Sequence, residues 1–215
     1  MKAGHGTKSG RRRRRVGLLG GSFNPAHGGH LQLSLEALKR LGLDEVWWLV
    51  SPQNPLKSAA GMAPLAARMA EARRVARHPR IRVTDIETRL GTRYTADTLA
   101  ALTRRRGDTG FVWLMGADNL EQIPRWKNWR RIFETLPIAV FDRPTYSLKS
   151  LRGVAARTFA RARRRPEAAR MLADARPPAW IFVPMRLNPL SATALRAART
   201  AADAGAVPTA KGANP

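Results

Sequence analysis

The chain has 215 residues, a formal net charge of +24 and no cysteine. This length suits one α/β domain with a proper core, and the missing cysteine excludes a disulfide framework and thiol chemistry. No apolar run is long enough to span a membrane, and the apolar block at 16–19 that follows the basic start is too short for a secretory signal. We therefore expect a cytoplasmic protein without a membrane partner.

The positive charge is concentrated in two places. Residues 1–15 hold seven basic side chains and no acid, and a second cluster of five arginines lies between residues 157 and 165. Basic clusters are typical of proteins that bind polyanions. Solvated arginines in a protein from an arginine-rich proteome explain the same composition, and we favour that interpretation. A nucleic-acid partner is therefore not expected.

Strands and helices alternate along the chain. Residues 1–15 are expected to form a disordered basic arm, because they are charged and hold nothing that could pack. Strands are predicted at 16–20, 46–50, 81–87, 111–115, 138–141 and 180–183. Helices are predicted at about 28–41, 65–78, 95–107 and 191–202, with a helical, insertion-like segment at 145–178 and a flexible tail at 203–215.

This order of elements predicts the fold class. Alternating strands and helices over residues 16–202 indicate a single doubly wound α/β domain. Several of the strands are continuously apolar, which suits a parallel sheet covered on both faces. We therefore expect a mainly parallel sheet of about six strands with helices on both sides.

The turn between the first strand and the first helix is the most informative stretch. From Gly20 to His30 it reads Gly-Gly-Ser-Phe-Asn-Pro-Ala-His-Gly-Gly-His. Glycines let the backbone approach a ligand, and the first turn of a helix offers N–H groups that bind anions. The two imidazoles are also open to interpretation as a zinc pair, but a third ligand is hard to find, since the chain has only His5 and His78 besides and no cysteine.

Other loops also follow predicted strands. Parallel strands end at the same edge of a sheet, where ligands of such folds bind. Residues 51–57, 116–118 and 185–191 should therefore converge with the glycine turn on one crevice. Asp118 is an acid at a strand end, which suits a ribose hydroxyl, Mg²⁺ or the N-cap of a helix.

The last predicted helix begins with a second motif. Ser191 is a good N-cap, and Arg196 lies about one turn into the helix. Together with Thr193 they supply hydroxyls, N–H groups and a guanidinium that can hold phosphate. Alone, this pattern is more often only a helix cap.

The glycine turn resembles the His-x-Gly-His signature of the nucleotidylyltransferase superfamily, and Ser191-x-Thr193-x-x-Arg196 resembles the C-terminal motif of that superfamily. Further segments are similar to the bacterial nicotinate-nucleotide adenylyltransferases. They are Pro-Gln-Asn-Pro-Leu-Lys at 52–57, Arg-Met at 68–69, Tyr-Thr-Ala-Asp-Thr-Leu at 94–99, Gly-Ala-Asp-Asn-Leu at 116–120 followed by Trp126, and Phe-Asp-Arg-Pro at 141–144. The resemblance is collinear over about residues 16–199 and implies a Rossmann-like fold.

The sequence departs from this family in three places. Leu56 replaces a histidine that many relatives have before Lys57, and Asn24 stands where many have aspartate. The 145–178 segment is longer than in compact relatives.

The resemblance implies transfer of AMP from ATP to nicotinate mononucleotide, with release of pyrophosphate and with Mg²⁺ bound to the ATP. It implies catalytic roles for His27, His30, Lys57 and Arg196. It implies that ATP is bound by both histidines and Arg196, together with Gly21, Ser22, Phe23, Gly116, Asp118, Ser191 and Thr193. It implies that the mononucleotide is bound by Asn54, Lys57, Tyr94, Thr95, Trp126 and Lys127. No residue of the chain is assigned as a metal ligand.

Two alternatives stay open at this point. A sister transferase that adenylylates phosphopantetheine or transfers a cytidylyl group would share both phosphate motifs. A basic RNA-binding protein would need exposed aromatic side chains interleaved with basic ones. Four tryptophans, however, lie in apolar strands and are expected in the core: Trp47, Trp48, Trp113 and Trp180.

Overall fold

The computed structural model describes residues 12–52, 61–105, 107–142 and 147–185. They form one sheet of six parallel strands in the order β3-β2-β1-β4-β5-β6. The strands are β1 (Arg14–Gly21), β2 (Glu45–Val50), β3 (Ile81–Thr84), β4 (Thr109–Gly116), β5 (Ile138–Phe141) and β6 (Trp180–Val183). The predicted doubly wound parallel sheet is confirmed. No helix within the described ranges has the length and apolar character needed to cross a membrane.

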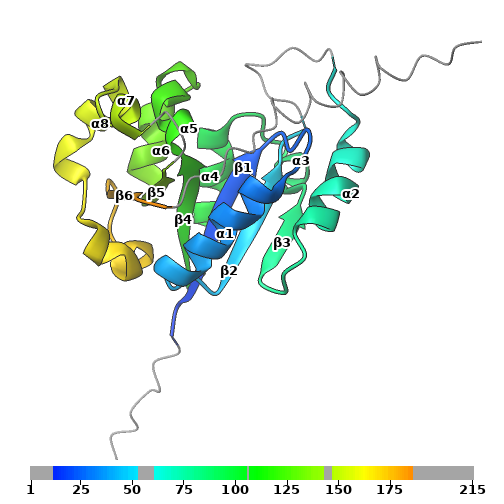
Figure 1. The fold of residues 1–215 in the computed structure, drawn as a ribbon, viewed down its shortest axis with the longest axis horizontal. Helices are drawn as coiled ribbons and strands as arrows, with labels where there is room; N and C mark the ends of the chain where they lie inside the picture. Colours follow the sequence, from blue (N-terminus) through cyan, green and yellow to red (C-terminus); the bar gives the residue numbers. More distant parts are fainter. Residues whose placement is uncertain (1–11, 53–60, 106, 143–146, 186–215) are drawn as a thin grey trace, which may run out of the picture.

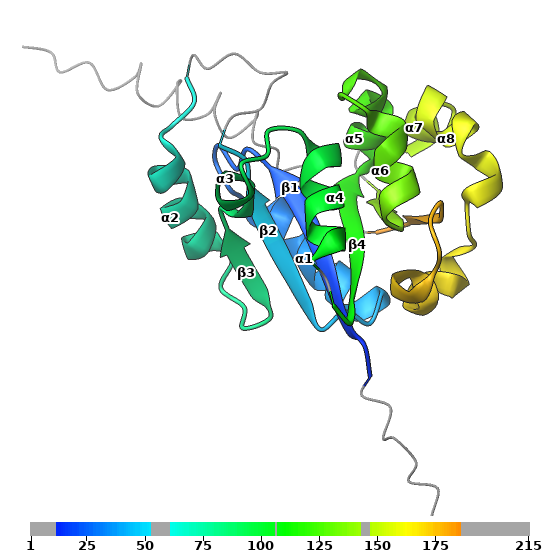
Figure 2. The same ribbon diagram turned by 180° about the vertical axis from the view of Figure 1, so that it is seen from behind.

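Helices cover both faces of the sheet (Figures 1 and 2). The α-helices are α1 (Gly28–Arg40), α2 (Leu65–Val75), α3 (Ile86–Leu90), α4 (Thr95–Arg104), α5 (Ala117–Gln122), α6 (Trp129–Thr135), α7 (Ser147–Leu151) and α8 (Val154–Thr158). Short 3-10 helices are η1 (Ile123–Arg125), η2 (Ala160–Ala162) and η3 (Pro166–Asp174). One buried cluster joins α1, α2 and η3 to one face, and a second joins α4, α5, α6 and α8 to the other.

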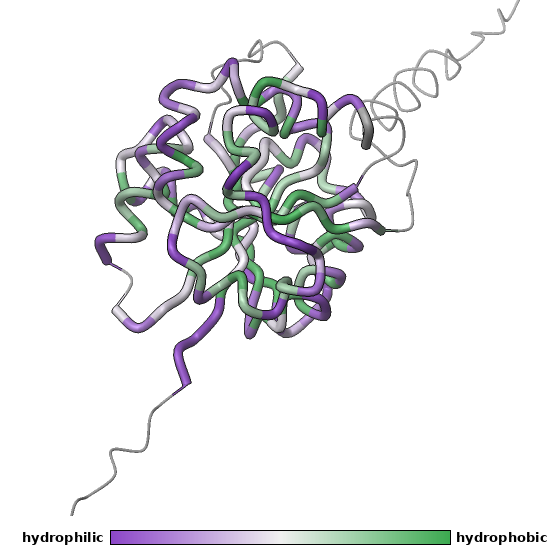
Figure 3. Tube along the Cα trace, turned by 90° about the vertical axis from the view of Figure 1, so that its left-hand side faces the viewer, coloured by the Kyte–Doolittle hydropathy of each residue, from purple (hydrophilic) through white to green (hydrophobic). Residues whose placement is uncertain are grey.

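The burial of the strands explains their composition. Every residue of β5 and β6 is buried, as is β4 from Gly110 onward. A strand covered on both faces gains from apolar side chains at every position, so polar and apolar residues do not alternate along it. Figure 3 shows the apolar stretches gathered in the middle of the molecule and the hydrophilic segment that leads into β1 at its margin.

Three predicted boundaries are wrong. The strand expected at 81–87 ends at Thr84, which pairs with Leu49 near the end of β2, and α3 follows it up to Gly91 in the left-handed conformation (φ +63°). The helix α2 ends at Val75 rather than at residue 78. The helix expected at 95–107 begins at Thr95 as predicted, with Tyr94 at the N-cap position, but it ends at Arg104.

The segment expected as a helical insertion covers one end of the sheet. Its described part, 147–178, contains the two short α-helices α7 and α8, followed by η2 and η3. Ala155 and Ala156 of α8 pack on one face of the sheet, and Leu172 and Ala173 of η3 pack on the other. This part of the segment therefore completes the core beside β5 and β6.

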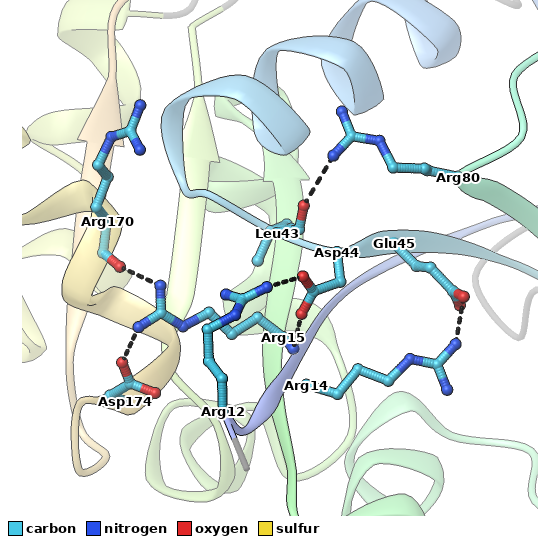
Figure 4. Close-up of polar contacts among 9 residues, drawn as sticks. All are labelled: Arg12, Arg14, Arg15, Leu43, Asp44, Glu45, Arg80, Arg170 and Asp174. Atoms are coloured by element: carbon cyan, nitrogen blue, oxygen red, sulfur yellow. Dashed lines mark hydrogen bonds and ion pairs between the residues drawn. The ribbon is translucent and has the colours of Figure 1, made fainter. Parts of the chain in front are cut away.

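The expected basic arm ends earlier than residue 15, because β1 begins at Arg14. Arg12 pairs with Asp44, Arg14 with Glu45, and Arg15 with Asp174 (Figure 4). The backbone of residue 15 also exchanges hydrogen bonds with that of residue 44 and with its carboxylate, at 2.8 and 2.7 Å. The guanidinium of residue 13 donates to the Thr109 carbonyl at 3.0 Å. The four arginines at 12–15, which the sequence analysis assigned to a free basic arm, therefore join the start of β1 to neighbouring segments. Residues 1–11 and 203–215 lie outside the described residues.

Deleting residues 1–15 is expected to lower the Tm by about 4–8 °C. Exposed ion pairs contribute little each, but together with the lost strand hydrogen bonds they amount to roughly 2 kcal/mol. Deleting residues 1–11 should change the Tm by no more than about 1 °C, because their sequence offers no apolar run that could pack. Thermal unfolding of both truncated chains beside the full chain checks this, and an equal Tm for all three would show that the arginine contacts do not stabilise the fold.

Candidate active site

The chain reverses its direction across the sheet between β1 and β4. These two strands are neighbours, yet β1 continues to β2 on one side and β4 continues to β5 on the other. Ligands of doubly wound sheets bind beyond the carboxyl ends of the strands at such a point. Here the strands end at Gly21 and Gly116, so the glycine turn and the start of α5 lie at this position.

Two glycines at the end of β1 have different surroundings. A Cβ at Gly20 would lie 2.4 Å from the ring of Trp113 in β4, which is too close for any side chain. A Cβ at Gly21 would meet the Phe23 ring at 3.4 Å or more, an ordinary contact. Packing against the neighbouring strand therefore requires Gly20, a reason that sequence reasoning alone did not find.

The two histidines of the motif cap the first helix. His27 is the N-cap residue of α1, and its Nδ1 accepts a hydrogen bond from the N–H of Gly29 at 3.1 Å. The N–H of His27 in turn donates to Nδ1 of His30 at 3.2 Å, which completes a capping box. Because Nδ1 accepts in both neutral rings, the proton lies on Nε2, and each Nε2–H is a donor suited to a phosphate oxygen.

The His30 ring is held by aromatic neighbours. Its centroid lies 4.7 Å from that of Phe23 and 3.8 Å from that of His27. Phe23 is buried, has a positive φ of 45°, and stacks on Trp48 of β2 at 5.0 Å. The indole of Trp48 donates to Ser34, whose hydroxyl donates to the His30 carbonyl, both at 2.8 Å. Trp48 was expected only as core, and Ser34 was not predicted at all.

Arg68 of α2 fastens the loops around the site. Its guanidinium is almost fully buried and donates to the backbone carbonyls of residues 22, 51, 52 and 63 at 2.7–2.9 Å. Burial lowers the pKa of this guanidinium from its ordinary value. The glycine turn and the chain after β2 are therefore held by one side chain. In the sequence, Arg68 was noted only as part of the family resemblance. Its role could not be predicted, because the carbonyls that it binds come from other segments of the chain.

The departure at Asn24 has a structural reason. Its side-chain Nδ2 donates to the carbonyl of Gly61 at 3.0 Å, and its Oδ1 accepts from the N–H of Ala63 at 3.3 Å. An ionised aspartate could only accept. The amide thus ties the glycine turn to the chain that leads into α2.

The segments expected to bind the acceptor meet in space. The Nζ of Lys127 lies 4.4 Å from the centroid of the Tyr94 ring, at the N-cap of α4. Trp126 is half-buried beside the same cluster that packs α4 against the sheet. Thr95 opens α4, and the first N–H groups of a helix have no acceptor within it. The fold therefore brings Tyr94, Thr95, Trp126 and Lys127 together.

Asp118 is the second residue of α5, and the N-cap of that helix is Gly116. The N-cap interpretation of Asp118 is therefore wrong, although an acid in the first turn is still stabilised by the helix dipole.

The described residues include no group of three or more His, Asp or Glu that could hold a metal ion. A metal carried on substrate phosphates needs few protein ligands. Asn54, Lys57, Ser191, Thr193 and Arg196 lie outside the described residues.

A doubly wound sheet with two imidazoles and a helix start at its switch point defines a nucleotide-binding class of protein. The sequence profile of the family described as cytidylyltransferase-like matches residues 18–198. A protein of Cereibacter sphaeroides, named "Probable nicotinate-nucleotide adenylyltransferase", is 60% identical over 182 residues, which cover 85% of this chain and 96% of that protein. A protein of Parvibaculum lavamentivorans with the same name is 65% identical over 136 residues, 63% of this chain and 68% of that protein.

The fold has a solved counterpart. The structure of Plasmodium falciparum nicotinic acid mononucleotide adenylyltransferase complexed with NaAD gives a TM-score of 0.65 at 14% identity and covers 86% of this chain and 83% of that one. At this identity the likeness supports the fold alone. From the sequence comparisons, the chain belongs to the nicotinate-nucleotide adenylyltransferases of the cytidylyltransferase-like family, a family of nucleotidyltransferase enzymes.

Proposed function

We propose that the protein transfers the adenylyl group of ATP to nicotinate mononucleotide and forms nicotinate adenine dinucleotide in NAD biosynthesis. Family membership supports the reaction, and the contact between Lys127 and Tyr94 supports the acceptor. Four of the residues assigned to the acceptor lie among the described residues, in two segments about 30 positions apart in the sequence, and the contact between Lys127 and Tyr94 joins these segments.

The reaction needs no nucleophile from the protein. An oxygen of the mononucleotide phosphate attacks the α-phosphorus of ATP, the bond from that phosphorus to the bridging α–β oxygen breaks, and pyrophosphate leaves with the electron pair. The protein has to align the two phosphates and stabilise the charge on the transferring group. In this proposal, the Nε2–H groups of His27 and His30 donate to the α-phosphate region, and the N–H groups that begin α1 add to them.

The other ATP contacts follow from the strand ends. Gly21, Ser22 and Phe23 lend backbone to the nucleotide, and Gly116 and Asp118 lie at the neighbouring strand end, where an acid suits a ribose hydroxyl. Mg²⁺ bound to the ATP phosphates would neutralise part of their charge. From the sequence motifs, we assign Ser191, Thr193 and Arg196 to the β- and γ-phosphates and Asn54 and Lys57 to the acceptor phosphate.

On the acceptor side, the half-buried Trp126 supplies an aromatic face for the pyridine ring, and the start of α4 at Thr95 supplies N–H groups for its carboxylate. Lys127 adds positive charge beside them. The RNA-binding alternative loses its aromatic support, because Trp48, Trp113 and Trp180 are buried. Trp47 is only half-buried and donates to Glu45 at 2.8 Å, so its assignment to the core is corrected.

Pyrophosphate release from ATP tests the proposal directly. The purified protein is given nicotinate mononucleotide, nicotinamide mononucleotide or phosphopantetheine as acceptor, with Mg²⁺ present and with a chelator as control. Release with nicotinate mononucleotide supports the proposal. Release with phosphopantetheine alone would assign the protein to the sister activity.

A further inference from the structure

Glu87 is a buried acid that the proposed reaction does not use. It is the second residue of α3, and its side chain is 5% exposed. Its carboxyl is hydrogen-bonded to the Ser51 side chain, and its Oε2 has no hydrogen-bond partner among the described residues. Burial raises the pKa of Glu87 to about 7, and the hydrogen bond to Ser51 opposes this only in part.

Ser51 lies where three parts of the site are joined. It directly follows β2, and its N–H donates to the carbonyl of Gly21 at the end of β1, at 2.9 Å. Its own carbonyl accepts from the guanidinium of Arg68 at 2.7 Å. Its side chain contacts Glu87. The position of Ser51 is therefore linked both to the glycine turn and to α3.

The backbone of Glu87 leads to the acceptor side. Its carbonyl accepts from the N–H of Thr92 at 3.0 Å, just after the left-handed Gly91. The Thr92 hydroxyl lies 2.8 Å from that of Thr98 in α4, the helix that begins at Thr95. Glu87, whose side chain contacts Ser51, is therefore also hydrogen-bonded through its backbone to the turn that leads into α4.

We propose that Glu87 is a positioning residue for the acceptor: its buried carboxyl and its backbone hold Ser51 and the α3–α4 connection in the arrangement that binds the mononucleotide. This inference rests on the proposed acceptor function of the start of α4. A carboxylate at this depth would be a buried charge, which costs free energy unless it is paired. Opening the contact to Ser51 would admit water to that charge and loosen the acceptor side.

The charged side chains on the elements around Glu87 are paired with other groups or lie at other positions of their elements. Within α3 and its N-cap, Arg89 pairs with Asp85 at 3.1 Å. On β2, Glu45 pairs with Arg14 at the opposite end of the strand, and on β3 the guanidinium of Arg82 lies over the ring of Trp47. On α4 the charged residues are Asp97 and Arg104. The guanidinium of Arg68 in α2 binds the backbone carbonyl of Ser51, whereas the carboxyl of Glu87 binds the Ser51 side chain.

The test measures the KM of nicotinate mononucleotide, the KM of ATP and kcat between pH 6 and pH 8. The Tm at each pH checks that the protein is folded. With a pKa of about 7, roughly a tenth of Glu87 is neutral at pH 8, so the acceptor KM of the natural protein should rise between pH 6 and pH 8, by up to about tenfold. The KM of ATP should change less. In Glu87→Gln the amide cannot ionise, so the pH dependence of the acceptor KM should be flat to within about threefold.

Three comparisons separate this effect from others. The acceptor phosphate itself titrates near pH 6, but the variant meets the same acceptor, so only the difference between the two profiles counts. Glu167→Gln, at an exposed glutamate of η3, should keep the profile of the natural protein. Ser51→Ala removes the partner, and it should give a raised acceptor KM with little further dependence on pH.

The Tm gives a second measure. Because the folded-state pKa of Glu87 lies above the ordinary value of 4.5, its contribution to stability is complete below that value and is lost as the pH rises to about 7. The Tm of the natural protein should therefore fall relative to that of Glu87→Gln between pH 5 and pH 8. Identical KM profiles in the two proteins, with normal turnover of nicotinate mononucleotide, would overturn the role of Glu87 and leave the proposed function standing. No turnover of this acceptor by either protein would overturn both.

Discussion

Replacing His30 with alanine is expected to lower kcat by about 10²–10³, the range for removing one preorganised donor to a transition-state oxygen. The Nδ1 of His30 is occupied by the N–H of His27, so Nε2 carries the proton that can be donated. The ring packs against Phe23, which holds it in place before substrate binds. The KM of ATP should change much less than kcat, because charge on the α-phosphate grows in the transition state.

The same ring also caps a helix, so the variant needs a control for stability. His30 is the N3 residue of the capping box, and its loss should cost about 1 kcal/mol. Gln is favoured at this position of a capping box, so His30→Gln should regain Tm while kcat stays low. His78→Ala, at the turn before β3, is a control outside the site. Near-normal kcat in a folded His30→Ala protein would show that His30 is structural only.

A second large effect is expected in the choice of acceptor. The kcat/KM for nicotinate mononucleotide should exceed that for nicotinamide mononucleotide by about 10²-fold or more. In the proposed site, the N–H groups at the start of α4 face the substituent of the pyridine ring. A carboxylate accepts from them and is favoured by the helix dipole, whereas a carboxamide presents its NH₂ to donors and leaves polar groups unpaired.

Trp126 tests the same site independently. Trp126→Ala should raise the KM of the acceptor more than that of ATP, because only the pyridine ring loses an aromatic face. Trp129, which is buried and contacts Phe133 and Phe159, offers a contrasting substitution: Trp129→Ala should lower Tm without favouring either substrate. Equal kcat/KM for the two mononucleotides would contradict the carboxylate-binding site even if adenylyl transfer were observed.

The sequence by itself was sufficient for the order of the six strands and for the edge of the sheet where we place the proposed site. Continuous apolar runs such as Ile138–Phe141 and Trp180–Val183 were placed correctly, because burial on both faces leaves a local signal. The glycine turn and its two histidines lie between a strand and a helix, as the local sequence indicated, and an anion site at this helix start stays a prediction. The first two residues of α3, Ile86 and Glu87, were mistaken for strand, because the alternating pattern of β3 continues through them.

Only the tertiary structure decided what holds these residues in place. Gly20 is required by the ring of Trp113, which lies on another strand, and Arg68 binds carbonyls of segments that are distant in sequence. Arg14 and Arg15 read as a solvated arm until β2 and η3 placed acids beside them. Glu87 read as part of a strand until burial next to Ser51 raised its pKa. Periodicity reports which face of an element is buried, whereas these contacts depend on which other segments lie against that face, and local sequence does not contain that information.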